Sequence, residues 1–225
     1  MNKLMLPLIL LVLALNTSCH YSDRRAVDRL DRAARALYEN SKPDSVRVLL
    51  DSINPERLND FDKSRLAMLT AMARYKSFTP IGSDSLLQVA VKEFEGRGDS
   101  LEYLSCLLAG VANSEVRNYS RAFMNLRRAE DLALADSNFY YAALAQREQG
   151  DIYKSVSLAK EEMEMACAAS ENFRKANKPE HEKWQIFAKA DALKNMHRPN
   201  EALELLHAAL NDTANMDEAF KRECY

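Results

Sequence analysis

The feature that most restricts the fold is a series of helical hairpins, of which residues 189–210 are the clearest. Small or apolar residues recur there every three or four positions on both sides of the turn at residues 197–200, which predicts two amphipathic helices joined by a tight corner. Four similar pairs precede it. The inner stripe of each second helix starts, in order, at Val46, Leu87, Ala122, Glu162 and Ala202, at nearly constant intervals.

This near-constant spacing predicts a stack of helical pairs, with an irregular helical bundle as the alternative. Glu162 is the one exception to the pattern, because a small residue is expected at its position. A shift of about one turn in the fourth pair would explain it, so the register of that pair stays open.

Composition supports an all-α fold. The chain of 225 residues contains only 5 Gly and 6 Pro, and its 47% of hydrophobic residues suffice for a core. The 31 Lys and Arg nearly balance the 33 Asp and Glu, for a formal net charge of -2. No basic excess marks a nucleic-acid partner, so we expect none.

The N-terminus has the pattern of a targeting segment. Lys3 supplies a positive charge, and residues 4–15 form an apolar run that only Pro7 interrupts. Such a run rises about 18 Å as a helix, which is short of the roughly 30 Å of a bilayer core. The small residues before Cys19 resemble a bacterial lipobox, which implies removal of residues 1–18 and lipidation of Cys19. An ordinary secretory signal with an incidental cysteine is the alternative.

Spacing within the hairpins resembles that of a known repeat. Gly110 with Ala122, Leu126 and Ala129, and Ala190 with Leu193, Ala202, Leu206 and Ala209, follow the small-and-large pattern of the tetratricopeptide repeat (TPR). Short phrases at residues 43–53 and 75–80 are similar to the repeat lipoproteins of Bacteroidetes. The resemblance implies a right-handed α-solenoid of about five TPR-like hairpins, with a partner held on the concave face.

The same interpretation divides the chain and gives it a cellular location. Residues 19–22 would be the lipidated cysteine and a short tether, residues 23–211 the repeat domain, and residues 212–225 the start of an incomplete further helix. The acidic cluster that accompanies surface export in Bacteroidetes-like lipoproteins does not follow Cys19. We therefore expect an anchor in the inner or outer membrane of the cell envelope that faces the periplasm.

The sequence contains no motif for catalysis or metal binding. Cys106, Cys167 and Cys224 lie far apart in the sequence, so they form no short-spaced metal or redox motif, and we expect them to be small buried hydrophobic residues. Neither a phosphate-binding loop nor a nucleophile elbow is present. We expect no enzyme activity, no cofactor and no metal.

The resemblance assigns a set of residues to the concave face, counted from the small residue of each first helix. They are Trp184, Phe187, Asp191, Lys194, Arg147, Asp151, Lys154, Tyr38 and Tyr75. Trp184 is the only tryptophan, and an aromatic anchor with charged neighbours is typical of a recognition surface. Packing between repeats is the alternative role for Trp184.

These expectations combine into a membrane-anchored periplasmic scaffold that binds a protein or peptide without catalysis. One alternative is a truncated relative of a TPR-containing sensory or transcriptional regulator. Another is a glycan-binding lipoprotein, although the bulky inserts that build such sites are missing.

Overall fold

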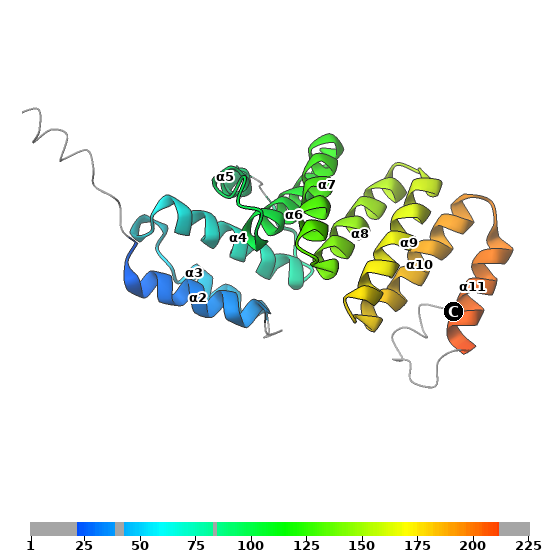
Figure 1. Cartoon of the computed structure of the whole chain (residues 1–225), viewed down its shortest axis with the longest axis horizontal. Helices are drawn as coiled ribbons and strands as arrows, with labels where there is room; N and C mark the ends of the chain where they lie inside the picture. Colours follow the sequence, from blue (N-terminus) through cyan, green and yellow to red (C-terminus); the bar gives the residue numbers. More distant parts are fainter. Residues whose placement is uncertain (1–21, 39–42, 83–84, 212–225) are drawn as a thin grey trace, which may run out of the picture.

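The computed structural model describes residues 22–38, 43–82 and 85–211, and these residues form helices and no strands (Figure 1). This confirms the all-α prediction. The α-helices are α2 (Arg24–Tyr38), α3 (Pro43–Asp51), α4 (Asp60–Lys76), α5 (Ser85–Glu93), α6 (Ser100–Glu115), α7 (Tyr119–Ala135), α8 (Phe139–Ser155), α9 (Ala159–Lys175), α10 (Pro179–Asn195) and α11 (Pro199–Asn211). A short 3₁₀ turn, Pro55–Arg57, precedes α4.

The helices form five pairs that follow one another in space as they do in sequence (Figure 1). Each helix packs mainly against its sequence neighbours, which makes the array elongated. The first helices of successive pairs also meet, since α4 contacts both α2 and α6, and α6 contacts α8. The first helices α4, α6 and α8 therefore share a face of the array, and the ion pair between Lys154 of α8 and Asp191 of α10 brings α10 to the same face.

The helices from α6 to α10 all end in the same turn. Residues 117, 137, 157, 177 and 197 have φ between 54 and 62°. In each turn the amide of the following residue donates a hydrogen bond of 2.7–2.9 Å to the carbonyl five residues earlier, as Asn138 does to Ala133. This is a Schellman-type end, formed here without glycine. The helices that follow these turns start at a constant interval, at positions 119, 139, 159, 179 and 199.

This regularity determines the register of the fourth pair. The helices α7, α9 and α11 begin at positions 119, 159 and 199, so Glu162 occupies the same place in α9 as Ala122 in α7 and Ala202 in α11. Glu162 is only 1% exposed. No shift of one turn occurs, and a buried carboxyl group replaces the small residue.

The close approach of helices explains one of the small residues. A Cβ atom on Gly110 of α6 would lie 2.6 Å from Cγ of Leu126 on α7, which is far inside normal contact. The equivalent glycine in α8, Gly150, would place its Cβ 3.4 Å from Met165, an ordinary contact. The α6–α7 interface is therefore the tighter of the two.

Burial varies along the array. Two large hydrophobic clusters fill the pairs from α2 to α9, whereas a small cluster around Ala190, Leu193 and Ala202 joins α10 to α11. The hairpin with the clearest sequence pattern thus has the smallest core. Asp99 caps α6, because its carboxylate accepts hydrogen bonds from the amides of Leu101 and Glu102.

The cysteine prediction is half right. Cys106 is buried, but Cys167 is exposed because Ala166 and Ala169 take the inward positions of α9. Cys19, Cys224 and the predicted segments 1–18 and 212–225 lie outside the described residues, as does the side chain of Tyr38. Within the described part of the chain, no helix has the length and apolarity to span a bilayer.

Candidate functional site

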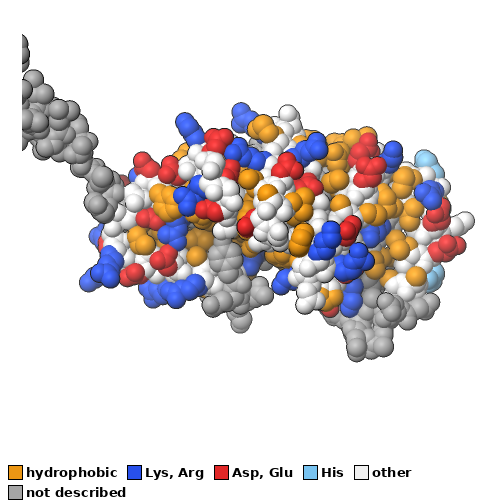
Figure 2. All heavy atoms as spheres, in the orientation of Figure 1, with side chains coloured by type: hydrophobic (Ala, Val, Ile, Leu, Met, Phe, Trp, Pro, Cys, Tyr) orange, Lys and Arg blue, Asp and Glu red, His pale blue; other side chains and the backbone are white. Residues whose placement is uncertain are grey.

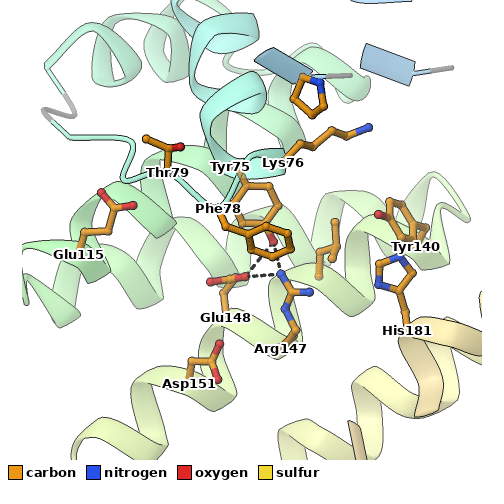
Figure 3. Close-up of a pocket in the computed structure, with 12 residues that line it drawn as sticks. Tyr75, Lys76, Phe78, Thr79, Glu115, Tyr140, Arg147, Glu148, Asp151 and His181 are labelled. Carbon is orange, nitrogen blue, oxygen red and sulfur yellow. Dashed lines mark hydrogen bonds and ion pairs between the residues drawn. The ribbon is translucent and has the colours of Figure 1, made fainter. Parts of the chain in front are cut away.

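A recess of about 590 Å³ opens on the face that the first helices share (Figure 3). Helices α4, α6, α8 and α10 all contribute to its lining, together with Pro43 of α3 and the turn after α4. The residues around it are aromatic or charged for the most part: Tyr75, Lys76, Phe78, Glu115, Tyr140, Arg147, Glu148, Asp151 and His181. Elsewhere, the face seen in Figure 2 carries both signs of charge interspersed with hydrophobic side chains.

The centre of the recess is a linked cluster of Tyr75, Arg147 and Glu148. The Arg147 guanidinium donates hydrogen bonds to the Tyr75 hydroxyl at 2.5 Å and to Glu148 Oε1 at 2.7 Å. The Tyr75 hydroxyl donates to the same Glu148 oxygen at 2.8 Å. Burial and the nearby Glu148 carboxylate raise the pKa of Tyr75 well above its ordinary value, so the phenol stays protonated.

Asp151 lies one turn further along α8, on the same side of the recess (Figure 3). It makes no hydrogen bond or ion pair with another described residue, whereas Arg147 and Glu148 are engaged with each other and with Tyr75. Its side chain is exposed at the surface, although the walls of the recess displace part of the water around it. This desolvation, reinforced by the Glu148 charge, raises the pKa of Asp151 to about 6.

The turn that follows α4 presents an aromatic side chain at the rim of the recess. Phe78 has φ 52° and is 96% exposed. The turn is fixed from both sides, because Glu115 accepts hydrogen bonds from the amides of Ile81 and Gly82 at 2.9 and 3.0 Å, and Arg74 donates to the carbonyl of Ile81 at 2.8 Å. A large exposed ring on an anchored turn is available for contact with a ligand.

The opposite end of the recess is covered by Lys178 and His181. The Lys178 ammonium lies 5.5 Å from the centre of the Tyr140 ring, and the His181 ring lies 5.4 Å from it at a steep angle. His181 also stacks on Phe173, with ring centres 5.1 Å apart. Burial and the neighbouring Arg147 charge lower the pKa of His181, which keeps its imidazole neutral at pH 7.

The predicted residues on α10 form a second group beside the recess. Lys154 of α8 pairs with Asp191 of α10, and Lys194 pairs with the other Asp191 oxygen at 2.9 Å. Burial alone would raise the pKa of Asp191, but the hydrogen bonds from both lysines lower it. Trp184 and Phe187 pack together with ring centres 5.3 Å apart, and Trp184 is 42% exposed, so it is not a core residue.

The structure thus brings the predicted residues into two neighbouring groups. Tyr75, Arg147 and Asp151 meet in the recess. The other group consists of Trp184, Phe187, Asp191, Lys194 and Lys154. Cys19 and the Tyr38 side chain lie outside the described residues.

Sequence reasoning missed several residues of the site, and some of them had a detectable signal. Tyr140, Leu144 and Glu148 recur one turn apart along α8, on the side that carries Arg147 and Asp151. Glu162 was conspicuous as an acid at a small-residue position. Phe78 had no such signal, because only the tertiary position of its turn brings it to the recess.

No protein-family model, curated protein or solved structure matches the chain. The function must therefore be argued from the site's own geometry.

Proposed function

We propose that this protein is a membrane-anchored scaffold of the bacterial periplasm that binds a protein or peptide partner on the face of its first helices, without catalysis. The observation that carries the proposal is the recess across α4, α6, α8 and α10, with the exposed Phe78 ring above the half-buried Tyr75–Arg147–Glu148 cluster. An aromatic side chain beside an arginine that is already held in place is a typical anchor for a partner.

The finer architecture belongs to the same proposal. A right-handed solenoid of TPR-like hairpins would curve so that the first helices line its concave face, where an extended peptide could contact several repeats at once. The starts of α7, α9 and α11, at positions 119, 159 and 199, are further apart than the TPR unit of about 34 residues allows. We therefore regard the hairpins as TPR-like rather than as standard copies.

The electrostatics of the recess support binding over chemistry. Arg147 and Glu148 neutralise each other, Tyr75 remains protonated, and neutral His181 stacks on Phe173 rather than pairing with a nucleophile. This arrangement positions polar groups for recognition and leaves no activated nucleophile among them.

Photocrosslinking in cells tests this proposal. A benzoylphenylalanine at position 78 is expected to give a discrete adduct with a partner. The matched control is position 124 on α7, where Met124 is 65% exposed but lies on a second helix. Adducts from position 124 with none from position 78 would contradict the proposal.

The anchor has its own test. Metabolic labelling with a fatty-acid analogue is expected to mark the wild-type protein and not the Cys19→Ala variant. Label that persists in this variant would exclude lipidation at Cys19.

A further inference from the structure

Most of the cationic groups in and beside the recess are already engaged by acceptors within the protein. Arg147 is held by Glu148 and Tyr75, and Lys76 of α4 donates a hydrogen bond of 2.5 Å to the Leu37 carbonyl. Lys154 and Lys194 share Asp191. An anionic ligand near Arg147 would have to break one of these interactions to gain a partner of its own, whereas Lys178, at the opposite end of the recess, faces the Tyr140 ring.

Two carboxyl groups remain without such a partner. Asp151 makes no hydrogen bond or ion pair with another described residue. Glu162 is 1% exposed, and neither of its carboxyl oxygens has a hydrogen-bond partner in the described part of the chain. Burial raises the pKa of Glu162 above its ordinary value, although Lys154 and Asn195 lie close enough to oppose the shift.

These two groups line one small space. A cavity of about 10 Å³ lies between α8, α9 and α10, with Arg147, Asp151, Glu162 and Gln185 in its wall. The side-chain oxygen of Gln185 is also buried and without a partner among the described residues. Arg147 and Asp151 line the large recess as well, so the small cavity adjoins it. The wall thus combines acceptor oxygens with the Arg147 guanidinium, which donates to Tyr75 and Glu148 instead. A further donor would satisfy these oxygens, and a space of this size accommodates roughly one water.

The rest of the recess suits a long side chain with a cationic end. Phe78 and Tyr75 offer ring surface on the α4 side, against which an aliphatic stem can lie (Figure 3). The cationic end would face Asp151 rather than Tyr140, because Lys178 and His181 already cover the Tyr140 ring.

We propose that the recess admits a lysine or arginine side chain of the partner, with its cationic head at Asp151 beside the Glu162 cavity and its stem against Phe78 and Tyr75. This inference rests on the proposed function, because it specifies which residue of a bound peptide enters the site.

The test starts from a random library of short peptides displayed on phage and selected on the purified full-length protein. The tightest binder is synthesised with each basic residue either intact or neutralised, lysine by acetylation and arginine by replacement with citrulline. Affinities are measured for the wild type, for Asp151→Asn and for Asp136→Asn. Asp136 is an exposed acid that precedes α8 and is not part of the recess lining, so it serves as the matched control.

We expect a basic residue in the selected peptides, and at least roughly tenfold weaker binding when one particular residue is neutralised, as for the loss of a charge-assisted hydrogen bond in a partly desolvated site. Asp151→Asn should weaken binding of the intact peptide by a similar factor, and neutralising the basic residue should then have little further effect. Asp136→Asn should change neither the affinity of the intact peptide nor the effect of neutralisation.

The remaining outcomes separate the two proposals. Binders that lack a basic residue, or a neutralisation effect that is equal in wild type and Asp151→Asn, would overturn this inference and leave the scaffold proposal standing. A library that yields no binder, while a glycan array does, would overturn the scaffold proposal and this inference with it.

Discussion

The two equivalent glycines Gly110 and Gly150 provide a matched pair of substitutions for testing the packing of the array. In Gly110→Ala the new Cβ would lie 2.6 Å from Cγ and 2.7 Å from Cδ2 of Leu126, and 3.3 Å from the Ala122 carbonyl oxygen. Leu126 is fully buried, so it has little room to move, and we expect overpacking to cost about 1–3 kcal/mol.

Alanine also has a higher helix propensity than glycine, by about 1 kcal/mol. When this gain is subtracted from the cost of overpacking, Gly110→Ala should lower the free energy of unfolding by about 0–2 kcal/mol. In Gly150→Ala the nearest atom is 3.4 Å away, so the propensity gain should remain and the variant should be stabilised. The difference between the two variants isolates the contact with Leu126.

Urea denaturation followed by circular dichroism measures this difference, provided that the slope of the transition stays the same in both variants. Leu126→Ala alone should lower the free energy of unfolding by about 2–5 kcal/mol. The loss should be smaller in the Gly110→Ala background, because the methyl group added at position 110 fills part of the cavity that Leu126→Ala leaves. If Gly110→Ala proved as stabilising as Gly150→Ala, the close packing of α6 on α7 would be refuted.

Three further predictions follow from the caps, thiols and buried acids. Asp99→Ala should destabilise the protein by about 1 kcal/mol by removing the cap of α6, whereas an unchanged urea midpoint would contradict that role. Iodoacetamide should modify Cys167 in the native protein and Cys106 only after unfolding, because burial raises the pKa of the Cys106 thiol to about 11; peptide mapping distinguishes the two. The folded state raises the pKa of Glu162, so a protonated Glu162 favours folding. This contribution to the free energy of unfolding is lost as the pH rises through the pKa that Glu162 has in the folded state. Glu162→Gln should accordingly be more stable than wild type at pH 7.5, with a gain that shrinks toward pH 4; the same gain at both values would exclude this explanation.

The fold class was predictable because its cause is local. Small and apolar residues recur at helical spacing along the chain, and they mark both the helices and their pairing. The constant interval between helix starts was harder to see, because the left-handed residue that ends each helix is Arg117, Ser137, Ser157, Asn177 or His197 rather than glycine. Without glycine, the sequence carries no clear sign that these turns are the same.

The candidate site was predictable only in part, because its interactions join distant segments. Counting along the first helices located Tyr75, Arg147 and Asp151 on one face, but the hydrogen bond from Tyr75 to Glu148 joins residues 73 positions apart. No local pattern predicts such a contact. The burial of Glu162 was hidden for another reason, since a carboxyl group at a small-residue position suggests a change of register rather than a buried acid.

Hydroxyl-radical footprinting of the full-length protein tests the central claim most directly. It measures how fast each side chain is oxidised, with and without a peptide selected from the random library. The claim predicts that bound peptide slows oxidation of Phe78 and Trp184, which lie on the face of the first helices, and leaves Met124 on α7 unchanged. Protection of Met124, with unchanged rates at Phe78 and Trp184, would contradict it.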